Sequence, residues 1–142
     1  MADVNYSKTI LVFFLTVIGA SLLLVVLTTV LKFKATGMTI VIPLISALFA
    51  GQSFVKKYQR APSPDEVKRL SNLSFFYYVG FQFLLLIIAL ANPQLKQLFA
   101  DMNGAVAAIA LVFLLFYFGI AYVFIRWAYG GLTRKFAEKS LK

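Results

Sequence analysis

The sequence predicts an all-α membrane protein, a bundle of four transmembrane helices that run up, down, up and down. Charged residues are absent from four stretches of the chain, residues 9–31, 35–55, 70–95 and 102–125. Each stretch can cross a hydrocarbon core of about 30 Å at about 1.5 Å per residue. Charged residues make up 13% of the 142 residues, against about 25% in a soluble domain. We therefore expect one membrane domain over residues 1–142.

The first predicted span covers residues 9–31. Its apolar core of about 23 residues is longer than the 7–15 residues typical of a signal peptide, so we expect a retained signal anchor. A short turn at 32–37 leads to the second predicted span at 38–55. Pro43 lies inside this span. Because proline lacks a backbone N–H, it predicts a kink in the second helix.

The largest predicted loop covers residues 56–69. Within it, Ser63, Pro64 and Glu66 have the spacing of a helix start: an N-cap, a proline at the first helical position and a capping box. The third helix is therefore expected to begin about two turns before its membrane span at 70–90.

Asn92 and Pro93 end the third span, and residues 94–100 are expected to form a short turn at the outer membrane surface. The fourth span is predicted at 104–125. Gly130 and Gly131 are expected to break the helix after it. In the tail, residues 130–142, Leu132 and Phe136 are four residues apart, and basic residues lie between and beyond them. This spacing predicts a basic amphipathic helix on the membrane surface.

Four spans place both termini on one side of the membrane. That side would carry eleven of the fourteen Lys and Arg residues, at the N-terminus, in the 56–69 loop and in the tail. Lys32, Lys34 and Lys96 are on the other side. Because short basic loops stay in the cytoplasm, both termini are predicted to be cytoplasmic.

Small residues mark one face of the second span. Ala47 and Gly51 are four residues apart, as are Ser46 and Ala50, and this pattern lets another helix backbone come close. Three uses are open: packing within the chain, packing against another protein, or a break that lines a substrate site. Gln82, the deepest amide, is expected to clamp two helices together. The predicted packing or partner-binding residues are Pro43, Ser46, Ala47, Ala50, Gly51 and Gln82.

The net charge of +9 is best explained by the membrane surface, because basic residues flank the spans and no nucleic-acid-binding module fits between them. The expected partners are therefore anionic lipids of the inner leaflet and not nucleic acid. The predicted anchoring residues are Lys56, Lys57, Arg60, Trp127, Arg134 and Lys135.

Several kinds of chemistry are excluded by composition. The chain has no cysteine and no histidine, so thiolate and imidazole catalysis and the metal sites that use these ligands are ruled out. No ionisable residue lies at depth in a span, which argues against proton coupling and transport of charged solutes. Asp65 and Glu66 are adjacent and are explained by helix capping. We expect no catalytic residue, no cofactor and no bound metal.

Ile42-Pro43, the run from Ala50 to Phe54, and the run from Tyr58 to Pro62 followed by Glu66 carry a resemblance. They are similar to a family of small, uncharacterised four-span inner-membrane proteins of Gram-negative bacteria. The resemblance implies a bacterial origin and a multi-pass location in the inner membrane. It implies no activity and no functional residues.

The sequence leaves three functions open. The first is a non-enzymatic interaction protein that acts through helix contacts inside the bilayer, one version being an immunity protein that neutralises a pore-forming toxin. The second is a small oligomeric channel or carrier for a neutral solute. The third is an accessory or lipid-binding subunit of a membrane complex. The expected protein partner is a second copy of the chain or another membrane protein.

Overall fold

The computed structural model describes residues 4–30, 32 and 38–141, and these residues are mainly helical, with no strand among them. The predicted turn at 32–37 lies, except for Lys32, outside the described residues. In chain order the elements are α1 (Ser7–Val30), the 3₁₀ turn η1 (Met38–Ile40), α2 (Val41–Tyr58), α3 (Pro64–Ala89), α4 (Pro93–Ala100), α5 (Gly104–Trp127), the π-helical turn η2 (Ala128–Leu132) and α6 (Thr133–Ser140).

Three helical stretches are long and apolar enough to cross a membrane: Ser7–Val30, Pro64–Ala89 and the continuous stretch Gly104–Ser140. The all-helical fold is therefore confirmed, with three helices able to span. The predicted four-span bundle is not confirmed, because α2 is not among these three helices. Its 18 residues include Lys56 and Lys57 in the last turn, which shortens its apolar part.

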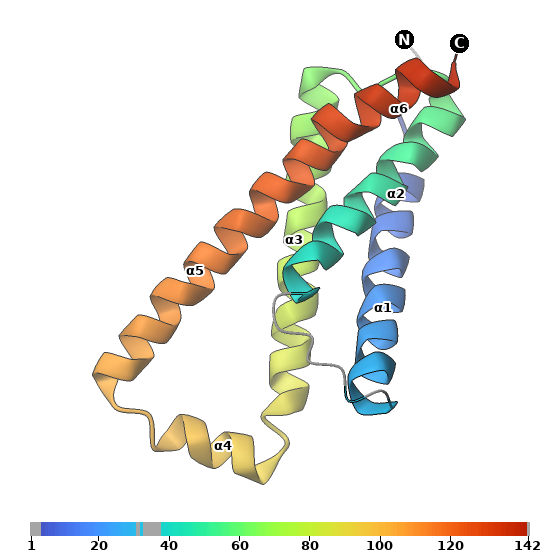
Figure 1. The fold of residues 1–142 in the computed structure, drawn as a ribbon. Helices are drawn as coiled ribbons and strands as arrows, with labels where there is room; N and C mark the ends of the chain where they lie inside the picture. The colour runs from blue at the N-terminus through green and yellow to red at the C-terminus, as the bar shows by residue number, and fades with distance from the viewer. Residues whose placement is uncertain (1–3, 31, 33–37, 142) are drawn as a thin grey trace.

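Helix α2 begins about midway along α1 and α3 and rises to the end where the termini lie (Figure 1). Pro43 is the third residue of this helix, so it does not kink the middle of a longer one. The first turn of a helix tolerates proline because its N–H groups have no partner within the helix. The prediction of a kink is therefore wrong, and Pro43 lies at a helix start.

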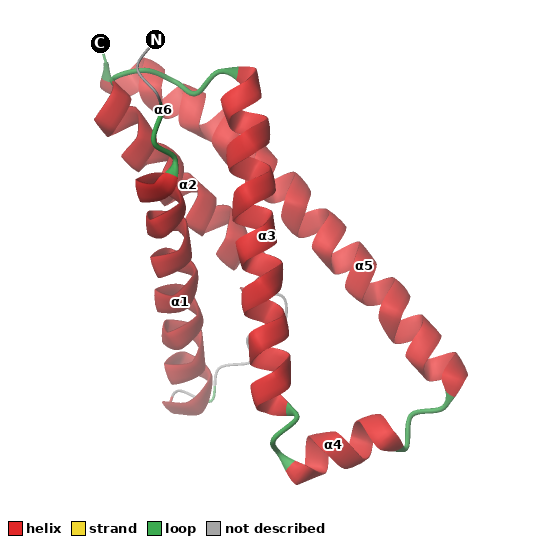
Figure 2. Cartoon of the chain, turned by 180° about the vertical axis from the view of Figure 1, so that it is seen from behind, coloured by secondary structure: helices red, strands yellow, loops and turns green. Residues whose placement is uncertain are grey.

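Both ends of the chain lie at one end of the molecule, together with the connection between α2 and α3 (Figure 1). We call this the termini end. The short helix α4 lies at the opposite end, where it joins α3 to α5 (Figure 2). Between these ends α5 diverges from α3, so that α3, α4 and α5 outline a triangle in both views.

The core is concentrated toward the termini end. It brings together side chains from α1, α2, α3, α5 and η2. In contrast, every residue of α4 and every residue from 104 to 116 of α5 is exposed. The largest fully buried core side chains are Phe13, Val17, Phe54, Leu70, Tyr78, Ile125 and Tyr129.

Gly130 and Gly131 do not break the helix, contrary to the expectation from the sequence. The chain passes through the π-helical turn η2 directly into α6, and the N–H of Thr133 bonds to the carbonyl of Ala128, five residues earlier. Because this turn keeps the backbone hydrogen-bonded, two glycines are accommodated without a helix end. The predicted tail helix is present as α6, with Thr133 and Ala137 buried.

Candidate functional site

The small-residue face of α2 is covered by the chain itself. Pro43, Ser46, Ala47, Ala50 and Gly51 are all buried. Helix α2 lies against α1, α5, η2 and α6. A partner protein would therefore have to bind a different surface of the molecule.

The closest approach on this face is between Gly51 and Thr133. A Cβ atom built on Gly51 would lie 2.0 Å from Thr133 Oγ1 and 3.1 Å from Thr133 Cβ. The Thr133 hydroxyl is fully buried and donates a hydrogen bond of 2.8 Å to the carbonyl oxygen of Ala128. Only glycine leaves room for this side chain, so Gly51 fixes how η2 and α6 dock on α2.

Ser46 Oγ is buried and, among the described residues, has no hydrogen-bond partner. A buried hydroxyl without a partner costs about 1–3 kcal/mol. Ser46 is therefore the least well satisfied polar group on the small-residue face.

Tyrosine hydroxyls hold α3 against α5 and η2 near the termini end. Tyr122 donates to Asn72 Oδ1 at 2.9 Å. The hydroxyls of Ser74 and Tyr129 lie 2.8 Å apart, and those of Tyr78 and Tyr117 lie 2.5 Å apart. We call these three hydrogen bonds the tyrosine clamp.

The sequence analysis singled out Gln82 on this helix and did not predict the three tyrosine contacts. A signal was present, because Ser74, Tyr78 and Gln82 are spaced four residues apart and so share one face of a helix. Gln82, the residue expected to act as the clamp, lies one turn beyond the last clamped tyrosine of α3. At this point the two helices begin to separate.

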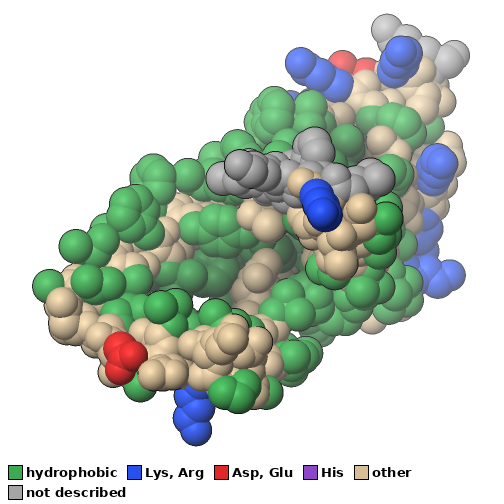
Figure 3. Space-filling model, turned by 60° about the horizontal axis from the view of Figure 1, so that its bottom comes forward, with side chains coloured by type: hydrophobic (Ala, Val, Ile, Leu, Met, Phe, Trp, Pro, Cys, Tyr) green, Lys and Arg blue, Asp and Glu red, His purple; other side chains and the backbone are tan. Residues whose placement is uncertain are grey.

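Between the tyrosine clamp and α4, an open groove of about 330 Å³ lies between α3 and α5. Gln82 and Tyr117 contribute its polar atoms, and the other lining side chains are apolar. Seen from the α4 end, the molecule is covered mainly by hydrophobic side chains and is hollowed near its centre (Figure 3). We call this the α3–α5 groove; it is lined by Gln82, Phe83, Leu85, Leu86, Ala89, Leu114, Tyr117 and Phe118.

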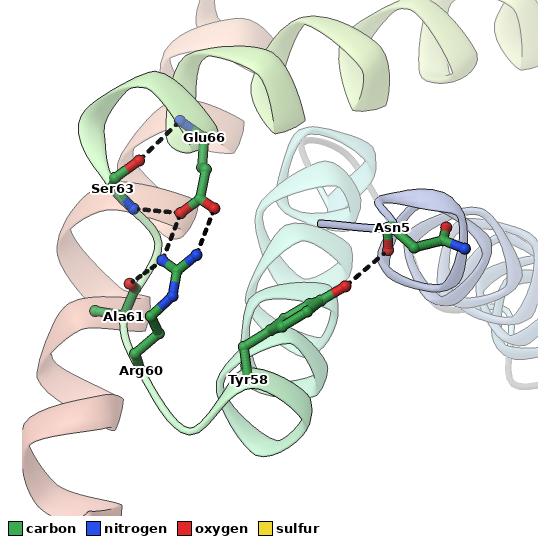
Figure 4. A network of polar contacts seen from close by, with 6 residues as sticks. All are labelled: Asn5, Tyr58, Arg60, Ala61, Ser63 and Glu66. Atoms are coloured by element: carbon green, nitrogen blue, oxygen red, sulfur yellow. Dashed lines mark hydrogen bonds and ion pairs between the residues drawn. The ribbon is translucent and has the colours of Figure 1, made fainter. Parts of the chain in front are cut away.

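At the termini end, the connection between α2 and α3 is fixed by Glu66 (Figure 4). The predicted capping box is present: Ser63 Oγ accepts from the Glu66 N–H, and the Ser63 N–H donates to Glu66 Oε2 at 2.7 Å. Arg60 donates two further hydrogen bonds of 2.7 Å to the same carboxylate. These bonds raise the pKa of the Arg60 guanidinium above its ordinary value.

Arg60 was predicted to anchor the membrane surface, and the structure gives it an internal partner. Its guanidinium pairs with Glu66 and also lies 5.6 Å from the centre of the Phe54 ring. The other predicted anchors, Lys56, Lys57, Trp127, Arg134 and Lys135, are exposed. Lys56 and Lys57 are in the last turn of α2, Trp127 ends α5, and Arg134 and Lys135 are on α6, so all five lie toward the termini end.

The described residues contain no group of three or more His, Cys, Asp or Glu side chains able to hold a metal ion. What the arrangement offers chemically is a packed core, an open apolar groove and a basic surface. No protein-family model, curated protein or solved structure shows significant similarity to this chain. The resemblance drawn from the sequence motifs stays a prediction.

Proposed function

We propose that this chain is a non-enzymatic, multi-pass protein of the bacterial inner membrane that binds a transmembrane helix of a partner protein. In this proposal α2 is the fourth, shorter helix of the bundle, and both termini are cytoplasmic. The observation that carries the proposal is the α3–α5 groove, which opens along two helices whose outer halves have no cover from the rest of the chain.

Packing physics supports a helix as the occupant. Helix association in a bilayer relies on close van der Waals contact and on hydrogen bonds, since lipid tails are as apolar as the side chains. Gln82 and Tyr117, which line the groove, supply polar atoms for a bond across the interface. Toward α4, beyond the residues that line the groove, α5 carries exposed small residues that permit close approach. The small residues are Gly104, Ala105, Ala107, Ala108 and Ala110.

Site-specific photo-crosslinking tests the proposal. A benzophenone amino acid would replace Leu114, which lines the groove, or Val123, which is exposed on the same helix outside it. We expect a discrete protein adduct from position 114 in native cells and none from position 123. Adducts of equal yield at both positions, or lipid adducts alone at 114, would refute the proposal.

The mass of the adduct identifies the partner. An adduct of twice the chain mass of 15.9 kDa would make the partner a second copy, in line with a homo-oligomer. A heterologous adduct would define another membrane protein.

The immunity version of the proposal has a separate test. A pore-forming toxin encoded beside the gene would be expressed with and without this chain, and growth would be measured. Protection that is lost on introducing Leu114→Trp, but retained with Val123→Trp, supports the version. If toxicity persists with the unaltered chain, the version fails while helix binding is still testable by crosslinking.

A further inference from the structure

A second groove, of about 540 Å³, lies at the termini end between the start of α3 and the junction of α5 with α6. Its apolar wall is formed by Pro62, Pro64 and Val67. Its other wall carries three cations, Arg126, Arg134 and Lys135, and one acid, Glu138. We call this the basic groove; Gly130 and Gly131 also line it.

The three cations of the basic groove are available to an outside anion. Arg126, Arg134 and Lys135 are exposed. Among the described residues, an ion pair joins Arg60 to Glu66 and none joins these cations to a carboxylate, and the groove holds one acid, Glu138, against three cations. The groove therefore carries a net positive charge.

The π-helical turn aligns the groove wall. Arg126, Gly130, Arg134 and Glu138 are spaced four residues apart. Four residues of an α-helix exceed one turn of 3.6 residues, so such a row drifts around an α-helix. A π-helical turn holds more residues and corrects the drift where it occurs. The insertion of η2 keeps the cations before and after it on the same side of the helix.

The glycine pair gives the groove a backbone floor. A Cβ atom on Gly131 would lie 3.1 Å from Trp127 Nε1, and one on Gly130 would lie 3.7 Å from Val67 Cγ1. The absence of side chains at these positions lets the indole lie against the helix and leaves the space beside Val67 open.

Trp127 also places the groove at the surface of the membrane. Its side chain is 53% exposed and directly follows Arg126. Tryptophan is enriched at the level of lipid headgroups, where its ring contacts both the apolar and the polar layer. Apolar side chains such as Val123, one helical turn before Trp127 and farther from the termini end, are exposed and suit contact with an acyl chain.

We infer that the basic groove binds the phosphate of an anionic phospholipid headgroup in the leaflet at the termini end. Basic pockets between helices at a membrane surface are suited to such headgroups, and Arg forms paired hydrogen bonds to phosphate oxygens. A lipid is favoured over a soluble anion because the cations, the interfacial Trp127 and the exposed apolar side chains are stacked in the order of a lipid molecule. This inference does not depend on the α3–α5 groove or on its partner.

The test compares two variants with the same change of charge. In the groove variant, Arg126, Arg134 and Lys135 are each replaced by Gln. In the control variant, Lys8, Lys68 and Lys139 are each replaced by Gln; these are exposed, do not line the basic groove and are not among the predicted anchoring residues. Circular dichroism of the purified proteins in detergent establishes that both variants are folded. If the groove variant does not fold, the single change Arg134→Gln is compared with Lys139→Gln.

Binding is measured by native mass spectrometry and by thermal unfolding with added dioleoylphosphatidylglycerol, with dioleoylphosphatidylcholine as the neutral lipid. We expect the anionic lipid to bind and stabilise the unaltered chain and the control variant, and its apparent affinity to fall at least about tenfold in the groove variant, as expected for the loss of charge-assisted bonds. Equal loss in both variants would overturn the inference in favour of diffuse surface charge.

Two further arms distinguish other anions. Glycerol 3-phosphate and inorganic phosphate are added in place of lipid; stabilisation equal to that by the lipid would replace the inference with a soluble-anion site. Displacement of the lipid by an acidic peptide at equal concentration would favour a protein ligand instead and would also overturn the inference.

Discussion

At the residue scale, the structure depends on a few contacts that a different side chain at the same position could not make. Gly51 admits Thr133, and Glu66 accepts hydrogen bonds from both Arg60 and the Ser63 N–H. The two contacts differ in how far they could be read from the sequence. The capping box lies within four consecutive residues, whereas Gly51 and Thr133 are far apart in the chain, and no local pattern connects them.

Gly51→Ala is expected to destabilise the protein by about 1–3 kcal/mol, because the new Cβ must displace Thr133, and overpacking of a closely packed site costs this much. Unfolding in detergent, followed by circular dichroism, measures the effect. Gly80→Ala is the matched control, since a Cβ atom there meets nothing within 4 Å.

Combining Gly51→Ala with Thr133→Ala is expected to recover part of the stability, because the second change removes the hydroxyl that stands closest. A Gly51→Ala protein as stable as the Gly80→Ala protein would contradict the packing described for this face.

At the scale of elements, the tyrosine clamp and the position of α2 shape the molecule. The clamp joins α3 to α5 and η2 only between the termini end and Tyr78, and beyond it the two helices separate. Helix α2 fills the space near the termini end alone, since it begins about midway along its neighbours (Figure 1). The same arrangement therefore packs one end of the bundle and leaves the α3–α5 groove open at the other.

Cysteine accessibility tests the depth at which α2 begins. The native chain has no cysteine, so an introduced cysteine is the one thiol that a maleimide can label. Thr39, in η1 just before α2, is exposed in the structure and is expected to face lipid near the middle of the bilayer. Thr39→Cys should resist a membrane-impermeant maleimide from either side of the membrane and react only after detergent is added.

Two single-cysteine variants calibrate this experiment. Gln97→Cys, on α4, should react from one side, and Lys139→Cys, on α6, from the other. If Thr39→Cys reacts from the same side as Gln97→Cys, α2 reaches the outer surface and spans the membrane fully.

At the scale of the whole molecule, charge is distributed unevenly between its two ends. Most Lys and Arg residues belong to segments at the termini end, and Lys96 is on α4 at the opposite end. The bilayer would therefore meet an asymmetric protein, with a packed basic end and an open apolar end. This asymmetry is the reason that we propose different ligands for the two grooves.

Fusion reporters test the orientation that this asymmetry predicts. Green fluorescent protein at the C-terminus should fluoresce, and alkaline phosphatase at the same position should be inactive, because short basic segments stay in the cytoplasm. The reverse pair of results would place the termini outside and would move the basic groove to the outer leaflet.

The sequence by itself determined the features that depend on neighbouring residues. The charge-free stretches predicted helices for a membrane, and the Ser63–Glu66 capping box and the Asn92 helix boundary were visible from spacing alone. Gln82 was recognised as a polar residue at depth, but its place at the opening of the α3–α5 groove was not.

Tertiary structure alone decided the start of α2 near Pro43, the pairing of Gly51 with Thr133, the tyrosine clamp and the continuous helix through Gly130. Each of these depends on contacts between segments distant in the chain, or on which of two allowed roles a proline or a glycine takes. Burial energies of distant segments settle such choices; local spacing can mark a candidate face, as that of Ser74 and Tyr78 does, but does not identify its partner.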